Sequence, residues 1–598
     1  MRRSASRPAL VVAGLTLAIA SLVGAPTVSA QEPEKVAEAR GTGGAAASVD
    51  ALGTQAAIDV LSDGGNAIDA AVAAAGVLGV VEPFSCGVGG GGFMVVRTAD
   101  GDVTTYDGRE KSPRAMRPDS FIENGRPLAF DPARFSGLSA GVPGTPLTWS
   151  RALNRYGTLS LREALRPGIR AARRGYMVDQ TFFDAVDAVK DFFDDVPATA
   201  ALYLDADGSP KDVGATIRNP DMARAYRLMA RNGVRRGFYR GPVAEAMVAA
   251  AQTPPVAPTA NHVWRKGLMT TDDLRRYTAP EREPVTTDYR GLVVYGMGPP
   301  SSGGTTVAEA LNILEGYSPL GASRNEILHR YLEASRYAFA DRNAFLADPV
   351  FFDVPVEGLN SDSFASERRG PIGDRAARSP VPAGNPYDNQ GGGGPAAANS
   401  ATISHPRQST THLTVADRMG NVVSYTFTIE STGGNGIVVP GYGFLLNNEL
   451  TDFNFDSTSH PNRAEGSKRP RSSMAPTIVE RGGRPYLALG SPGGSTIIGT
   501  VLQTLVNRVD LHEPLLRAIS LPRAVERNTA TTQAEQAFIE SPEGLDLVAV
   551  RGHRFAPPLA PGEIGAATGI EIRRRGRFVA VAEPERRGGG SAGVVRPR

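Results

Sequence analysis

Two threonines are predicted to pair across a β-hairpin that directly follows a flexible segment of the sequence. Residues 410–417 and 422–429 alternate with the period of β-strands, and turn formers lie between them. A three-residue loop, residues 418–420, places Thr410 directly opposite Thr428, where cross-strand side chains nearly touch. A two-residue loop shifts this pairing by one residue. The hairpin is therefore the first candidate for chemistry.

A second candidate is the glycine pair Gly493-Gly494. It follows a predicted hairpin, residues 475–480 and 484–490, and precedes an apolar helix from about residue 495 to 507. Backbone N–H groups at a helix N-terminus converge, so this turn has the features of an anion or oxyanion site. A plain tight turn is the alternative, and the residue types alone favour it.

Other chemical motifs lack the context that they need. Residues 87–92 match the dinucleotide fingerprint, but a helix precedes them and a strand follows, the reverse of the required order. Residues 137–141 match the serine hydrolase elbow without an apolar strand upstream. The seven histidines show no metal-ligand spacing, His412 is interpreted as a packing residue, and Cys86 is the only cysteine. We expect no metal and no cofactor.

The predicted secondary structure that must position these candidate residues differs from one part of the chain to the next. Residues 31–55 predict a mobile lead-in. Residues 56–81 predict two packed helices, broken at Gly64-Gly65. Residues 93–96 and 103–106 predict a hairpin of two strands. Residues 147–346 are mainly helical. Residues 379–409 hold prolines, a glycine run and small polar residues, and they predict a flexible linker because they cannot bury enough apolar surface.

The N-terminus predicts export. A basic start, an uncharged apolar core at residues 9–23 and Val28-Ser29-Ala30 form a signal peptide, cleaved after Ala30. The core is shorter than the roughly 20 residues of a membrane span, so we expect no membrane anchor. With a net charge of +2 and no visible concentrated basic face, we expect no nucleic-acid partner. The arginine runs near Arg573 and Arg586 are interpreted as solvated surface.

Together the motifs resemble the gamma-glutamyltransferase family along nearly the whole mature chain. The matching segments are GGNAIDAAV (64–72), the glycine run ending in GFM (92–94), DGRE (107–110), TTH (410–412), NNELTDF (447–453), KRPRSSM (468–474) and GSPGGS (490–495).

This resemblance implies an α+β fold, a four-layer αββα N-terminal nucleophile hydrolase sandwich. The precursor would cut itself before Thr410 into a large subunit (31–409) and a small catalytic subunit (410–598). The new α-amino group, with a pKa near 8, would be the base for the Thr410 hydroxyl. Thr428 would hydrogen-bond this nucleophile. Gly493 and Gly494 would donate oxyanion N–H groups, which replaces the tight-turn interpretation.

The resemblance also implies a site for a free amino-acid head group. Arg109, Ser472 and Ser473 would hold the α-carboxylate, since a guanidinium matches two oxygens. Glu449 and Asp452 would hold the α-ammonium.

Two features depart from the family pattern. Glu430 stands where well-known members carry Asn beside the ammonium site, and it adds a negative charge. Only 15 residues (453–467) separate Asp452 from Lys468, fewer than in members with a mobile lid, so we expect an open site.

We therefore expect a periplasmic or extracellular gamma-glutamyltransferase and glutathione hydrolase. It would pass the γ-glutamyl group to water or to an amino acid or peptide, with its two subunits paired as a heterodimer. Two alternatives keep the fold: an acylase of the glutaryl-cephalosporin type, and a poly-γ-glutamate hydrolase or transpeptidase. A glutaryl group lacks the ammonium that Glu449 and Asp452 are expected to bind, and this disfavours the acylase alternative. A processed binding protein without turnover is disfavoured by the retained Thr410 and Thr428.

Overall fold

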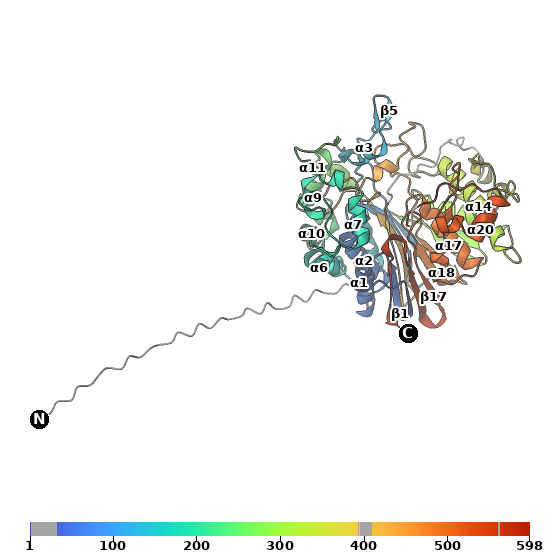
Figure 1. Ribbon diagram of the computed structural model, residues 1–598, viewed down its shortest axis with the longest axis horizontal. Helices are drawn as coiled ribbons and strands as arrows, with labels where there is room; N and C mark the ends of the chain where they lie inside the picture. Colours follow the sequence, from blue (N-terminus) through green and yellow to red (C-terminus); the bar gives the residue numbers. More distant parts are fainter. Residues whose placement is uncertain (2–32, 393, 395–408, 560–561, 598) are drawn as a thin grey trace. The chain divides into compact units, whose positions relative to one another are not determined.

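The computed structural model describes Met1 and residues 33–392, 394, 409–559 and 562–597 (Figure 1). The predicted signal peptide and residues 395–408 of the predicted linker therefore lie outside the described residues. No helix within the described ranges is both long and apolar enough to cross a membrane.

One 13-stranded sheet forms the centre of the protein, and neighbouring strands are antiparallel. In spatial order its strands are β8 (Glu281–Arg282), β3 (Val103–Gly108), β2 (Gly91–Arg97), β12 (Val422–Thr428), β11 (Thr411–Asp417), β1 (Glu38–Ser48), β18 (Arg577–Ala582), β17 (Thr568–Arg573), β14 (Arg484–Gly490), β13 (Thr477–Arg481), β10 (Leu292–Gly296) and β9 (Val285–Tyr289), with β19 (Ser591–Pro597) also paired to β1.

The sheet doubles over into two layers. β11 and β12 contact β14 and β17 face to face, and small or branched apolar side chains such as Ala47, Val95 and Ile570 fill the space between. Helices cover both outer faces (Figure 1). One outer layer includes α1 (Ala51–Ser62), α2 (Ala67–Val81), α4 (Thr145–Tyr156), α6 (Arg166–Arg174) and α10 (Pro220–Gly237); the other includes α13 (Gly303–Glu315), α14 (Arg324–Phe345), α17 (Thr496–Val509) and α18 (Leu515–Ser520). The predicted αββα arrangement is confirmed.

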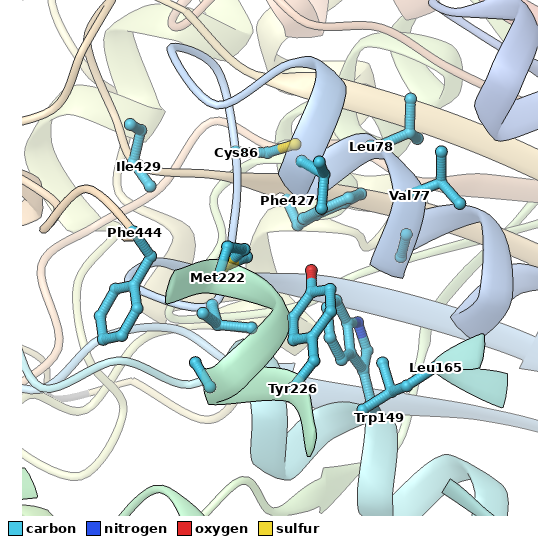
Figure 2. Packing of buried hydrophobic residues seen from close by; sticks show 14 of the residues in the cluster. Val77, Leu78, Cys86, Trp149, Leu165, Met222, Tyr226, Phe427, Ile429 and Phe444 are labelled. Atoms are coloured by element: carbon cyan, nitrogen blue, oxygen red, sulfur yellow. The ribbon is translucent and has the colours of Figure 1, made fainter. Parts of the chain in front are cut away.

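Helix α2 anchors the first helical layer. Asn66 and Asp69 close its N-terminus with a capping box, which pairs N–H groups that the first turn would leave free. Every residue of α2 is buried. Figure 2 shows Val77 and Leu78 of this helix in the cluster with Trp149, Leu165 and Tyr226. The predicted helix pair broken at Gly64-Gly65 is thus confirmed.

The predicted mobile lead-in is wrong. Residues 38–48 form β1, which pairs with β11, β18 and β19. Its glycines and alanines give no hydrophobic alternation in the sequence, because the space between the two sheet layers accepts only small side chains there. The order of this segment comes from strands hundreds of residues away.

Three further predictions need correction. The predicted linker is packed over its first part, where Tyr387 is buried and its hydroxyl donates to the Asp353 carbonyl at 2.6 Å. The mainly helical region also contains the β9–β10 hairpin, which extends the sheet. Arg586 is buried rather than solvated, since Glu535 and Glu583 pair with it. Arg573 is exposed, as expected.

Candidate active site

The hairpin brings the two threonines together as predicted. Thr411 pairs with Phe427 across β11 and β12, a register that places Thr410 opposite Thr428. The hydroxyl of Thr410 donates to that of Thr428 at 3.2 Å. Residues 418–420 form the loop, closed by the Asp417 N–H on the Asn421 carbonyl at 3.0 Å. The three-residue loop is therefore confirmed.

The Thr428 hydroxyl connects three groups around the Ser409–Thr410 bond. It accepts the backbone N–H of Glu430 at 2.8 Å and donates to the carbonyl of Ser409 at 3.2 Å. The Thr410 hydroxyl also contacts that carbonyl. A nucleophile, a proton acceptor for it and a donor for the carbonyl oxygen thus lie together at one peptide bond.

Glu430 takes a backbone conformation that non-glycine residues rarely adopt. Its φ is 80°, in the left-handed region, which costs about 1–2 kcal/mol for a residue with a Cβ. This turn directs the Glu430 N–H to Thr428 and its carbonyl to the Ser409 N–H at 3.0 Å. The strain is therefore located where it positions the hydroxyl pair.

The glycine pair lies directly before helix α17. Gly493 and Gly494 have φ values of 133° and 56°, and among the described residues neither N–H has an acceptor. Gly494 lines one cavity and Gly493 lines a second, and Thr410 borders both cavities. Two free donors at a helix N-terminus next to a hydroxyl are suited to stabilise an oxyanion.

The first cavity brings together nine of the ten predicted site residues. It measures about 50 Å³ in the uncut chain, and the second measures about 600 Å³. The predicted residues that line the first are Arg109, Thr410, Thr428, Glu430, Glu449, Asp452, Ser472, Ser473 and Gly494. The space in the first cavity suits a water molecule rather than a ligand.

Arg109 follows the end of β3 and is fully satisfied by its surroundings. Its guanidinium pairs with Glu449, and with Asp452 at 2.5 Å, and it donates to the Pro470 and Arg471 carbonyls. Burial lowers the pKa of Arg109, but the two carboxylates outweigh burial and raise it. The predicted cation and anion subsites therefore neutralise each other when no ligand is present.

Burial favours the protonated form of two carboxyl groups of the site, Glu430 and Glu449. Burial, followed by the nearby Asp452, raises the pKa of Glu430 to about 7. Burial also raises the pKa of Glu449, although Arg109 opposes it. The head-group site reaches solvent at Asp452, because the Asp452 side chain is 21% exposed whereas the side chains of Arg109 and Glu449 are 1% exposed.

Three buried residues of this region were not assigned a role from the sequence. Arg342 on α14 donates to the Ser473 hydroxyl at 2.7 Å, and Arg471 donates to the carbonyls of residues 342, 343 and 346. Both line the first cavity. Burial raises the pKa of Glu110, which lies beside Arg109, to about 8. The matched motifs contain Glu110 and Arg471, but no sequence signal marks Arg342.

The rejected motifs take structural roles. His412 is buried, and its Nδ1 lies 2.8 Å from the Thr426 hydroxyl; burial lowers its pKa to about 3. The Ser139 hydroxyl donates to backbone carbonyls. Residues 87–90 lie between helix α2 and strand β2, and residues 91–92 begin β2, so a helix precedes this segment and a strand follows. In the part of the chain that the structure describes, no side-chain group is suited to hold a metal ion.

Known proteins resemble this chain along most of its length. The family model described as Gamma-glutamyltranspeptidase matches residues 53–593. A glutathione hydrolase proenzyme of Bacillus subtilis (strain 168) is 36% identical over 562 residues, covering 92% of this chain and 91% of the relative. An Acylase ACY 1 proenzyme of Pseudomonas sp. (strain V22) is 35% identical, covering 86% and 87%. The crystal structure of a cephalosporin acylase from Bacillus halodurans superposes with a TM-score of 0.81 at 29% identity, covering 96% and 99%.

Proposed function

This chain belongs to the gamma-glutamyltranspeptidase family and is an enzyme, and from that premise we propose that it is an exported glutathione hydrolase and gamma-glutamyltransferase. It cuts itself before Thr410 into residues 31–409 and 410–598, which stay together as a heterodimer. The observation that carries the proposal is the 3.2 Å contact of Thr410 with Thr428 beside the Ser409 carbonyl.

Self-cleavage begins with the Thr410 hydroxyl. Its oxygen attacks the Ser409 carbonyl carbon and passes its proton toward Thr428, while the Thr428 hydroxyl stabilises the oxyanion. The C–N bond then breaks, the Thr410 nitrogen gains a proton, and an ester links Ser409 to the Thr410 oxygen. Water hydrolyses this ester, which frees the Thr410 hydroxyl beside the new Thr410 amine and leaves Ser409 with a carboxylate. The cavity of about 50 Å³ supports the proposal that the uncut chain is inactive.

Turnover uses the amine that cleavage creates. The amine takes the proton from the Thr410 hydroxyl, and the oxygen attacks the γ-amide carbonyl of the substrate. N–H groups of Gly493 and Gly494 stabilise the oxyanion, each contributing about 3 kcal/mol. The amide nitrogen leaves with a proton as an amine, and the γ-glutamyl ester passes to water or to an acceptor amine. The second cavity, which measures about 600 Å³ and is also lined by Thr410, has room for the departing group.

The head group binds by exchanging partners with residues that are paired in its absence. The α-carboxylate of the substrate binds the guanidinium of Arg109 and lies next to Ser472 and Ser473. The α-ammonium replaces that guanidinium as the partner of Glu449 and Asp452. Every charge thus keeps an opposite charge, so the site selects a ligand that carries both signs.

An acylase for glutaryl side chains is the second candidate, because acylases are among the similar proteins. A glutaryl carboxylate would also take Arg109, but it brings no cation for Glu449 and Asp452. Leaving a buried charge without its partner costs about 2–5 kcal/mol. The two carboxylates beside Arg109 therefore favour γ-glutamyl substrates. A poly-γ-glutamate chain carries the head group at its end and stays an alternative substrate.

The test compares Thr410→Ala with Thr410→Ser. At 62.9 kDa for 598 residues, cleavage yields fragments of about 40 and 20 kDa, and the smaller begins Thr-Thr-His-Leu. We expect the alanine variant to remain uncut and inactive, and the serine variant to keep part of both activities because its hydroxyl survives. Release of a chromophore from γ-glutamyl and glutaryl anilides then separates the two substrates. An uncut but fully active chain would refute the proposal.

A further inference from the structure

Helices α6 and α10 carry an unusual excess of arginine. Together they contain nine arginines and a single acidic residue, Asp221. The whole chain is nearly neutral, with 64 basic and 62 acidic residues. Basic residues therefore strongly outnumber acidic ones on these two helices, although the two kinds nearly balance over the whole chain.

The two helices lie side by side on buried α2. A Cβ at Gly168 of α6 would come within 2.6 Å of the Gly76 carbonyl of α2 and 2.8 Å of the Tyr226 ring of α10. The Tyr226 hydroxyl donates to the same carbonyl at 2.8 Å. Figure 1 shows α6 and α10 next to each other at the outer side of the helical layer. Their arginines thus belong to one continuous surface.

Helical spacing directs six arginines outward. Those of α6 are spaced i, i+4, i+7 and those of α10 are spaced i, i+3, i+7, so each set lies on one face, opposite the buried residues of its helix. All six are exposed. This arginine face comprises Arg166, Arg170, Arg173, Arg224, Arg227 and Arg231. It stops before Gly233, where α10 turns with a φ of 71°.

The protein neutralises the arginine face only weakly: Glu163 interacts electrostatically with Arg166, but at longer range than an ion pair. None of its six side chains forms an ion pair with a carboxylate of the described residues; Arg224 stacks on the ring of Tyr442 at 5.2 Å. Other exposed arginines do pair, as Arg275 and Arg276 do with Asp272. Six like charges on one face repel each other, and a surface of negative charge relieves that repulsion.

We propose that the arginine face docks the protein on a bilayer that contains anionic phospholipid. Two helices side by side present a broad surface rather than a groove, and guanidinium forks match lipid phosphates. The large apolar side chains exposed elsewhere on the protein are not found on α6 or α10, so docking is electrostatic and does not insert a helix. No aromatic side chain on this face offers a stacking platform for bases, which disfavours a nucleic acid. This inference does not depend on the proposed activity.

The expectation of no concentrated basic face is therefore wrong. The six arginines come from two segments about 50 residues apart, and only the packing of α6 against α10 makes them one surface. No single run of the sequence contains all six arginines.

Vesicle sedimentation tests the proposal with the purified protein. The vesicles contain equal parts of phosphatidylcholine and phosphatidylglycerol, and pure phosphatidylcholine vesicles are the reference. Each basic residue near an anionic bilayer strengthens partitioning about fivefold, so Arg166→Gln with Arg170→Gln and Arg173→Gln should weaken it about a hundredfold. We expect the triple substitution Arg224→Gln, Arg227→Gln and Arg231→Gln to act similarly, and salt to release the protein.

A matched control removes three exposed arginines at the ends of hairpins, by Arg418→Gln, Arg481→Gln and Arg574→Gln. It changes the net charge equally, and we expect less than a fivefold effect. Equal losses in the control and in the helix variants would overturn a localised docking face. Failure of the wild-type protein to sediment with anionic vesicles would also overturn it. Tighter binding to duplex DNA than to these vesicles would assign the face to a nucleic acid instead.

Discussion

Replacing Glu430 by glutamine removes one charge from the head-group site and preserves its shape. The Glu430 carboxylate accepts from Asn448 and from the Ser431 hydroxyl at 2.5 Å, and a glutamine oxygen accepts the same donors. Burial and Asp452 raise the pKa of Glu430 from 4.5 to about 7. At 1.36 kcal/mol per pH unit, its ionisation therefore costs about 3 kcal/mol more in the folded chain than in the unfolded chain.

The sign of the pH dependence follows from where the proton is held. Between pH 4.5 and about 7 the unfolded chain has lost the Glu430 proton and the folded chain still holds it. The free energy of unfolding of the Glu430 protein therefore falls as the pH rises through this window, and the contribution of this group is constant above it. Relative to Glu430→Gln, the loss should total about 3 kcal/mol.

Urea unfolding at a series of pH values measures this difference. Both chains should carry Thr410→Ala, so that they remain uncut. Glu245→Gln, which removes an exposed carboxylate from helix α11 (Pro242–Gln252), is the matched control. Glu430→Asn is less suitable because asparagine also tolerates the left-handed backbone at this position. If the free energies of unfolding with and without Glu430→Gln change in parallel from pH 4.5 to 7, Glu430 is ionised throughout and the electrostatic reasoning is refuted.

Three further substitutions test the remaining groups. Arg109→Ala leaves the Glu449 and Asp452 carboxyl groups without their cation, so we expect the transition-state stabilisation measured by kcat/KM for γ-glutamyl anilide to fall by about 2–5 kcal/mol; cleavage before Thr410, followed by electrophoresis, should persist. Asp452→Ala should lower kcat/KM for γ-glutamyl anilide much more than for glutaryl anilide, and equal losses would contradict the ammonium assignment. Gly494→Ala adds a Cβ at a φ of 56°, costing about 1–2 kcal/mol; we expect kcat to fall because relief of this strain moves the N–H, and a kcat equal to wild type would show that the turn keeps its geometry.

Local patterns in the sequence determined much of the candidate site by themselves. Strand alternation on both sides of residues 418–420 predicted that Thr410 lies opposite Thr428, because antiparallel register follows from loop length. The glycine pair before an apolar helix offered an oxyanion site at Gly493 and Gly494 as one of two interpretations, and the family resemblance selected it over a plain tight turn. Such features depend on neighbours in the chain, which is why the sequence was sufficient for them.

Other features depend on which distant segments meet, and tertiary structure alone decided them. Strand β1 has no hydrophobic alternation, and its order comes from pairing with β11 and β18. Arg342 joins the site only because α14 packs beside Ser473. The direct pairing of Arg109 with Glu449 and Asp452 appears only when β3 meets residues that lie about 340 positions later. Sequence patterns report local geometry, whereas burial, pKa shifts and ion pairing arise from long-range packing that no local pattern records.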